Sequence, residues 1–243
     1  FHKTMQILYT PYVNKELTST DFFTLKNKTV ITQAVVQAFN TLYNSNVSEI
    51  KGYDSVIEAV IQKYVWRCLG IDQIYAPFTI QNLEYRVNYT YKYNKSKEVN
   101  IGGIIDRIDS KNGSMRMVDY KTGRVSYDIN GIDELFDREN KKRNDKVLQI
   151  LLYAWIIAKN TNNHAIHTAF ISFIDNAENN TFVKFKDTGE LLVCTPQIQN
   201  IIENNLSQLF TELFDENIPF EQTKNTVICK FCDYNKICKK DVF

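Results

Sequence analysis

The stretch GGIIDRIDSKNGSMRMVDYKTG, residues 102–123, decides the fold. Two apolar runs flank Asn112-Gly113, the dipeptide that best tolerates the positive backbone φ angles of a two-residue hairpin turn. If these two residues form the turn, Lys111 pairs with Ser114, and every further pair is one step away along both strands. The stretch therefore predicts a β-hairpin with a defined register.

This register brings charged residues face to face. Asp109 lies opposite Arg116, an attractive pair, whereas Asp106 lies opposite Asp119. Two carboxylates at roughly 5 Å repel each other by some tenths of a kcal/mol, and by more where water is excluded. Lys121, two residues after Asp119, projects from the same face of its strand. Stability gives no reason for two facing acids, but a divalent cation between them does.

Two carboxylates beside an ammonium group suit chemistry on a phosphate. Mg²⁺ prefers hard oxygen ligands and is usually held by one or two carboxylates together with substrate phosphate. Such a cation polarises the phosphate and lowers the pKa of a bound water, while a lysine orients the water and offsets developing charge. These residues predict hydrolysis of a phosphodiester. The alternative, from the residues alone, is an ordinary surface hairpin with scattered charges.

The segments GGIIDRID and DYKTG, at this spacing, resemble the PD-(D/E)XK nuclease superfamily, and within it the RecB-like nuclease domain at the C-terminus of AddB, the B subunit of an ATP-dependent helicase/deoxyribonuclease. The resemblance implies that Asp106, Asp119 and the carbonyl of Tyr120 bind Mg²⁺ or Mn²⁺ and that Lys121 is catalytic. It also implies that His2, in the opening FHKTMQILY, reaches the metal, although a terminal histidine is more often solvated.

A Gln-x-x-x-Tyr motif of the same family matches Gln149 and Tyr153 in DKVLQILLYAWIIAK. Four-residue spacing places both on one face of a helix. The resemblance implies that they act in catalysis by positioning the lysine or the DNA strand; alternatively, they are polar edges of an apolar helix. Glu84, in NLEYRV, stands where the family commonly has a glutamate, and a surface pair with a basic neighbour is the alternative.

A basic segment, RENKKRNDK at residues 138–146, precedes this helix and holds five basic and two acidic side chains. Such a segment can contact backbone phosphates in a salt-dependent, sequence-independent way. A solvated charged loop is an equal alternative. The candidate DNA-binding residues are Arg138, Lys141, Lys142, Arg143 and Lys146.

The tail segment CKFCDYNKIC has the spacing C-x₂-C-x₅-C, formed by Cys229, Cys232 and Cys238. Thiolates this close can share one metal centre, with disulfides as the competing explanation. The AddB family ends with this spacing and uses it for a [4Fe-4S] cluster that clamps the C-terminus. Cys68 and Cys194 lie in apolar runs and are expected to be small buried hydrophobes.

The fourth cluster ligand is therefore not apparent. In the family the first cysteine lies upstream of the helix that carries the histidine, and this chain opens within that helix. We expect the cluster in the full-length protein but not necessarily in this fragment, where the three tail cysteines would be reduced, disordered or bound to zinc.

Composition fits one domain over residues 1–243, as part of a longer chain. The 243 residues are 44% hydrophobic and 23% charged, enough for one sizeable core. The net charge of +1 does not by itself indicate a polyanion partner. No run of eighteen apolar residues occurs, so no membrane span is expected.

The apolar period divides the chain into three regions. Residues 1–75 have helical spacing near 3.6, and residues 76–190 hold the catalytic sheet and helix, starting with the alternating LEYRVNYTYKY. HTAFISFI is expected to be a strand and TFVKFK an edge strand. In residues 191–243, Thr195-Pro196 begins a helix that should end before Pro219, ahead of the cysteines. The pattern predicts an α/β fold, a restriction-endonuclease-like core with a mixed sheet and an added helical region.

The resemblance implies a Mg²⁺-dependent deoxyribonuclease, most simply an exonuclease, in the cytoplasm. It would process DNA ends for recombinational repair with an AddA-like helicase-nuclease subunit. The alternatives are a stand-alone exonuclease of the CRISPR-adaptation type and a non-catalytic DNA-binding or structural module. A scaffold has no need of a repulsive acid pair, which argues against the last.

Overall fold

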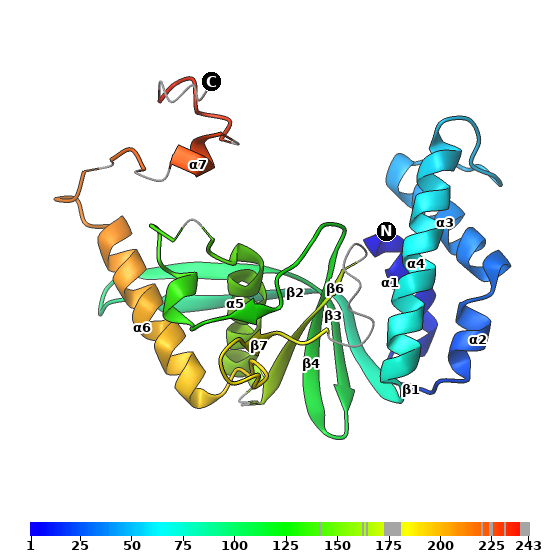
Figure 1. Cartoon of the computed structure of the whole chain (residues 1–243), viewed down its shortest axis with the longest axis horizontal. Helices are drawn as coiled ribbons and strands as arrows, with labels where there is room; N and C mark the ends of the chain where they lie inside the picture. Colours follow the sequence, from blue (N-terminus) through cyan, green and yellow to red (C-terminus); the bar gives the residue numbers. More distant parts are fainter. Residues whose placement is uncertain are drawn as a thin grey trace.

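A mixed five-stranded sheet with strand order β1-β2-β3-β4-β6 forms the centre of the protein, with helices packed at both ends (Figure 1). The computed structural model describes all residues except 141, 162, 164, 173–180, 220, 224–225, 231 and 239–243. The strands are β1 (Glu16–Leu17), β2 (Phe78–Lys92), β3 (Glu98–Lys111), β4 (Ser114–Lys121) and β6 (Ile166–Ser172). Each of the strands β1 to β4 pairs antiparallel with the next one in the sheet, and β6 pairs parallel with β4. The predicted α/β architecture is confirmed.

The N-terminal helices gather at one end of the sheet (Figure 1). They are α1 (His2–Tyr9), the 3₁₀ turn η1 (Thr10–Tyr12), α2 (Asp21–Leu25), α3 (Lys28–Tyr43) and α4 (Asp54–Tyr75). The side chain of Asn27 caps α3 by accepting from the Thr29 N–H, and Asn44 ends it in the left-handed conformation. Val65, Cys68 and Leu69 form the buried side of α4. They belong to the hydrophobic core that also contains residues of α1 and of the sheet.

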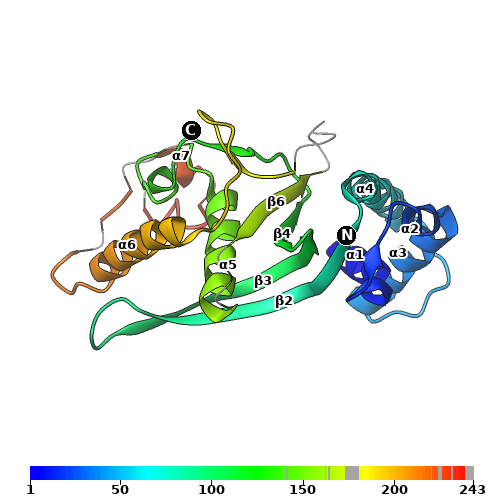
Figure 2. The ribbon, with the colours of Figure 1, turned by 90° about the horizontal axis from the view of Figure 1, so that it is seen from below.

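At the other end, α5 (Asp145–Thr161) lies across the long β2–β3 hairpin, with α6 (Pro196–Leu213) beside it (Figure 2). Trp155 of α5 is fully buried between the rings of Tyr89 and Tyr91, at centroid distances of 5.1 and 5.6 Å. Helix α6 begins as predicted: Thr195 caps it by accepting from the Ile198 N–H. The smaller elements are η2 (Asp133–Leu135) and α7 (Thr226–Cys229).

The predicted alternation along β2, from Leu83 to Tyr93, is only partly right. Val87, Tyr91 and Tyr93 belong to the core beneath α5 and α6, but Leu83 packs in the core with α1 and α4. Tyr85, expected to face inward, is 41% exposed. Between Leu83 and Tyr85, Glu84 has a φ of +48°, and such a residue locally reverses which face a strand presents. The sheet therefore changes its covered face at Glu84.

The segment TFVKFK is not a regular edge strand of the main sheet. Only β7 (Lys184–Phe185) is regular, and it pairs with β5 (Asp128–Ile129) in a separate two-stranded sheet. Backbone bonds from Phe170 N to Thr181 O and from Val183 N to Thr168 O still hold the segment beside β6. The end of the predicted strand HTAFISFI, beyond residue 172, lies outside the described residues.

Among the described residues, no helix combines the length and the apolar character needed to cross a membrane.

Candidate active site

The β3–β4 hairpin forms as predicted. Asn112 and Gly113 make the turn with φ angles of 52° and 78°. The expected register is confirmed in the five pairs Arg107↔Val118, Ile108↔Met117, Asp109↔Arg116, Ser110↔Met115 and Lys111↔Ser114. A turn with positive φ at both central residues matches the twist of the two strands, which explains why the dipeptide sets the pairing.

Asp106 lies one step beyond the last of these pairs. Its Oδ2 accepts a hydrogen bond of 2.7 Å from the backbone N–H of Tyr120. This N–H of β4 is therefore bonded to a side chain and not to a backbone carbonyl of β3. The negative charge of Asp106 is also one of the causes that raise the pKa of Asp119. The two acids thus lie close together at the point where the regular hairpin pairing ends.

Asp119 and Lys121 share one face of β4, as their two-residue spacing requires. Lys121 Nζ lies 2.8 Å from Asp119 Oδ2. The contact lacks hydrogen-bond angles, and Oδ2 is a buried oxygen without a donor among the described residues. Burial raises the pKa of Asp119, and the charge of Asp106 adds to that rise while Lys121 opposes it. The site therefore holds a buried carboxylate on which the charge of Asp106 and that of Lys121 act in opposite directions.

His2, the first residue of α1, reaches this acid pair. Its Nε2 lies 3.2 Å from the carbonyl oxygen of Tyr120 and 3.4 Å from Asp106 Oδ2. The hydrogen bond with Asp106 is the main cause of a raised pKa for His2, and partial burial opposes the rise. Phe1 packs edge-on against Tyr120 with ring centroids 5.5 Å apart. Hence the start of the chain is packed at the site.

Gln149 and Tyr153 lie on the face of α5 that meets β3 and β4. Lys121 Nζ donates to Gln149 Oε1 at 3.1 Å, and Gln149 Nε2 donates to the hydroxyl of Tyr153 at 3.2 Å. Tyr153 in turn packs directly on Gly103 of β3, where any Cβ would fall 2.3 Å from the hydroxyl. A chain of three side chains thus runs from the glycine position to the lysine.

Glu84 adds a third carboxyl group near Asp106. It is next to Leu83 and Tyr85, which pair with the two neighbours of Asp106 on β3. Burial is the main cause of a raised pKa for Glu84, and the negative charge of Asp106 adds to it. No ion pair links Glu84 to a basic residue in the described part of the chain.

Sequence reasoning missed a group of buried charges beside this site, namely Asp72, Arg107, Asp109 and Arg116, which are at most 1% exposed. Only the Asp109–Arg116 pair was foreseen, and its burial was not. One signal was present: Asp72 interrupts the apolar side of the helical run CLGIDQIY. Its partner, however, comes 35 residues later.

The basic segment before α5 is partly engaged within the protein. Arg138 pairs with Glu212 of α6 at 2.8 Å, and Arg143 Nε lies 2.6 Å from Asp145 Oδ1. The other described basic residues are Lys142, which is exposed, and Lys146, which is half-buried and whose Nζ donates to the carbonyl of Arg124. Lys141 lies outside the described residues. Of this segment, Lys146 is tied to the turn that follows Lys121.

The three tail cysteines are free thiols, with Cys229 buried and Cys232 and Cys238 half-buried. The other two behave as predicted. Cys68 and Cys194 are fully buried in the two cores, and burial raises the pKa of both, that of Cys194 to about 12. Such thiols stay protonated and are poor metal ligands. Within the described residues, the three tail cysteines are not gathered into a group that could hold a metal ion.

The donor set around Asp106 and Asp119 fits a hard divalent cation. Among the described residues, no group of three or more His, Cys, Asp and Glu side chains is arranged so that it could hold a metal ion by itself. Mg²⁺ does not need one, because it typically keeps several waters and binds one or two carboxylates. Asp119 Oδ2 is buried, and because its 2.8 Å contact with Lys121 Nζ does not have hydrogen-bond geometry, this oxygen can also serve a cation. The carbonyl of Tyr120 and the carboxylate of Asp106 complete an all-oxygen set.

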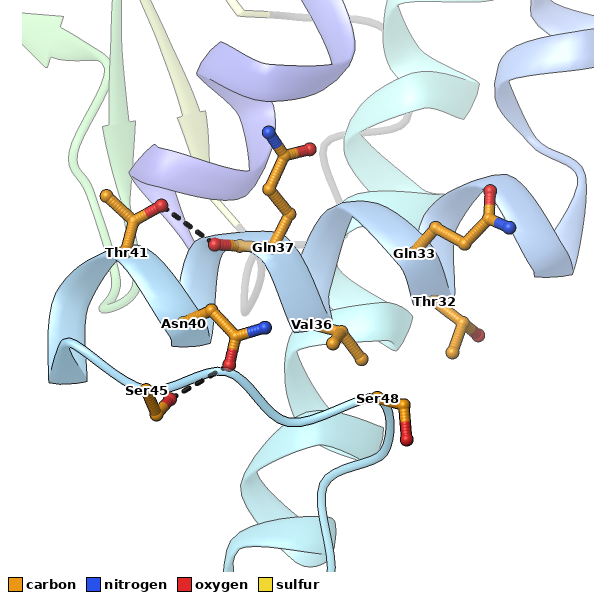
Figure 3. Close-up of a pocket in the computed structure, with 8 residues that line it drawn as sticks. All are labelled: Thr32, Gln33, Val36, Gln37, Asn40, Thr41, Ser45 and Ser48. Atoms are coloured by element: carbon orange, nitrogen blue, oxygen red, sulfur yellow. Dashed lines mark hydrogen bonds between the residues drawn. The ribbon is translucent and has the colours of Figure 1, made fainter.

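A shallow hollow of about 470 Å³ lies elsewhere, on α3 and the loop after it (Figure 3). Its lining is polar and uncharged apart from Val36, and it includes Thr41 and Ser45, whose hydroxyls bond to Gln37 O and Asn40 Oδ1. None of the acidic or basic candidate residues borders it. The candidate site residues therefore lie away from this hollow.

One of three comparisons with known proteins identifies the family of this chain. A search of curated proteins finds no match. Among solved structures, the crystal structure of SSO0001 aligns with 12% identity and a TM-score of 0.35, covering 88% of this chain and 98% of that one. The family model of the PD-(D/E)XK nuclease superfamily matches residues 1–239. The chain belongs to the PD-(D/E)XK nuclease superfamily.

Proposed function

We propose that this protein is a metal-dependent deoxyribonuclease, acting as an exonuclease on DNA ends. One observation carries the proposal: the ammonium group of Lys121 lies 2.8 Å from Asp119 Oδ2 and 3.1 Å from Gln149 Oε1, beside a second acid, Asp106. Membership of a nuclease superfamily over nearly the whole chain supports it.

Each residue of the site has a distinct task. Asp106, Asp119 and the Tyr120 carbonyl, with His2 at its edge, would hold Mg²⁺ or Mn²⁺. When bound, the cation supplies Lewis acidity toward the phosphate. Lys121 orients the attacking water and offsets negative charge on the phosphate oxygens as it develops.

Gln149 and Tyr153 keep the lysine in place. Gln149 accepts from Lys121 and donates to Tyr153, so the ammonium group is held against Asp119 and does not swing into solvent. A group fixed in its reactive geometry avoids reorganisation during the reaction. Lys146, bonded to the turn after Lys121, is the member of the basic segment best placed to contact a DNA phosphate.

The role of an AddB-like nuclease domain is part of the proposal. The motif resemblance supports work in DNA end processing and recombinational repair, in the cytoplasm, beside an AddA-like helicase-nuclease subunit. The spacing of Cys229, Cys232 and Cys238 supports a [4Fe-4S] cluster in the full-length protein. Anaerobic purification of the full-length protein should then give absorbance near 400 nm, whereas a colourless, zinc-containing full-length protein would contradict the cluster.

Degradation of linear DNA with Mg²⁺ or Mn²⁺ tests the activity. The wild type should release nucleotides and lose activity in EDTA, and Lys121→Ala should lose the activity while keeping its thermal transition. Lys97→Ala, in the distant turn between β2 and β3, serves as the matched control and should cut like the wild type. A wild type that cuts no DNA with either metal, or a Lys121→Ala variant that cuts normally, would overturn the proposal.

A further inference from the structure

Arg107 is a fully buried arginine located directly beside a candidate metal ligand, Asp106. Its two terminal nitrogens donate to both carboxylate oxygens of Asp72 on α4, at 2.6 and 2.8 Å. Its Nε lies 3.0 Å from Asp109 Oδ2. Both Arg107 and Asp72 have side chains that are 0% exposed. Burial alone opposes ionisation of Asp72, yet the charge of Arg107 and its hydrogen bonds keep the pKa of Asp72 below its ordinary value.

This ion pair touches two elements of the candidate metal site. Arg107 Nη1 donates to the hydroxyl of Tyr120 at 2.9 Å, and the carbonyl of the same tyrosine is a candidate ligand. The hydroxyl of Tyr9, at the end of α1, donates to Asp72 Oδ2 at 2.5 Å. Helix α1 spans eight residues and begins with His2, so the pair anchors the end of the helix opposite to the histidine.

The arrangement has the features of an outer shell around metal ligands. Groups that hold ligands by hydrogen bonds tune metal sites without touching the metal. Arg107 adjoins Asp106 in sequence, binds the side chain of Tyr120 and, through Asp72 and Tyr9, holds the helix of His2. The guanidinium also lies among the rings of Tyr9, Phe78 and Tyr120, at 5.3 to 5.6 Å from their centroids, so its own position is fixed.

We propose that Arg107, paired with Asp72, is a positioning residue that holds the Tyr120 backbone and helix α1 in the geometry needed to bind the divalent cation. The inference rests on the proposed function, since it concerns the same metal site.

Arg116 supplies an internal control of the same residue type and burial. It is 1% exposed, pairs with Asp109 at 2.8 and 2.9 Å, and stacks on Tyr75 at 3.4 Å. Arg116 belongs to the same buried network, since its Nη2 lies 3.8 Å from Asp72 Oδ1 and its partner Asp109 lies 3.0 Å from Arg107 Nε. Unlike Arg107, however, it contacts neither Tyr120 nor a residue of α1 in the interactions described. A loss of structure alone should therefore affect Arg107→Lys and Arg116→Lys alike, whereas a positioning role should separate them.

Binding of Mn²⁺ to the purified chain, followed by electron paramagnetic resonance, tests the proposal without requiring activity. Arg107→Lys should bind Mn²⁺ roughly 10- to 100-fold more weakly than the wild type, as for other groups that orient metal ligands. Arg116→Lys should retain the wild-type affinity. The dissociation constants are compared at a temperature at which circular dichroism shows each variant to be fully folded, because a reversibly unfolded fraction would itself raise the apparent dissociation constant.

The milder variants Tyr120→Phe and Tyr9→Phe cover the case in which Arg107→Lys does not fold, since each removes one hydroxyl of the network. Each should weaken Mn²⁺ binding severalfold. Wild-type affinity in the Arg107 variant, or in both tyrosine variants, would overturn the proposal, as would equal losses in the Arg107 and Arg116 variants. A wild type without Mn²⁺ binding would instead overturn the metal site itself, and the proposed function with it.

Discussion

Replacement of Gly103 by alanine tests whether the packing of Tyr153 sets the position of the catalytic lysine. The new Cβ would lie 2.3 Å from the Tyr153 hydroxyl and 2.6 Å from two ring carbons, whereas ordinary contact begins at 3.4 Å. Moving the hydroxyl from 2.3 to 3.4 Å is a shift of about 1.1 Å. The hydroxyl holds Gln149 at 3.2 Å and Gln149 holds Lys121 at 3.1 Å, so the shift reaches the ammonium group.

Two magnitudes follow from this shift. Overpacking of this kind typically lowers the free energy of unfolding by about 1–3 kcal/mol. A reacting group misplaced by about 1 Å can lose roughly 10²-fold in rate. We therefore expect Gly103→Ala to remain folded at moderate temperature while kcat/KM for DNA falls by about 10- to 100-fold.

The assay combines urea unfolding with initial rates of DNA degradation at saturating Mg²⁺. Gly123→Ala, two residues after Lys121, is the control, because nothing lies within 4 Å of a Cβ built there. It should match the wild type in both measurements. If Gly103→Ala loses stability but cuts DNA at the wild-type rate, Tyr153 and Gln149 do not govern the lysine, and the reasoning is refuted.

Three further changes have defined outcomes. Gly113→Ala should lower the free energy of unfolding by about 1–2 kcal/mol in urea, because position 113 has a φ of +78°; an unchanged midpoint would contradict the turn assignment. The pKa of Asp72 is below its ordinary 3.8, so its stabilisation is present above that value and lost as pH falls through the lower pKa of the folded state. The stability difference between wild type and Asp72→Asn should shrink below pH 3.8, and a constant difference would be inconsistent with the shift. Mg²⁺ at 100 times its dissociation constant should stabilise the wild type by about 2.7 kcal/mol, seen as a raised Tm, but not Asp119→Asn; equal shifts would place the ion elsewhere.

Local chemistry explains what the sequence alone could predict. The Asn112-Gly113 turn fixed the hairpin register, because few dipeptides tolerate two positive φ angles in succession. The Thr195-Pro196 start of α6 was equally readable, since the cap and the proline act within one turn of helix. The relation between Asp119 and Lys121 followed from the two-residue period of a strand, and that between Gln149 and Tyr153 from the helical period.

Features that depend on distant residues were not predictable in this way. The β2–β3 hairpin is covered by helices on one face before Glu84 and on the opposite face after it. No local sequence pattern predicts where this change of covered face occurs. The pairing of Arg107 with Asp72 joins a strand to a helix 35 residues earlier. The basic segment shows the same limit: the run of charges was visible in the sequence, but the ion pair between Arg138 and Glu212 was not.

The central claim is that Asp106, Asp119 and the Tyr120 carbonyl together hold a divalent cation next to Lys121. A crystal grown with Mn²⁺ and examined by anomalous scattering tests it most directly. We predict one strong anomalous peak in contact with oxygens of both carboxylates and of the carbonyl, and no such peak in Asp119→Asn. A peak elsewhere on the protein, or none near these oxygens at saturating Mn²⁺, would contradict the claim.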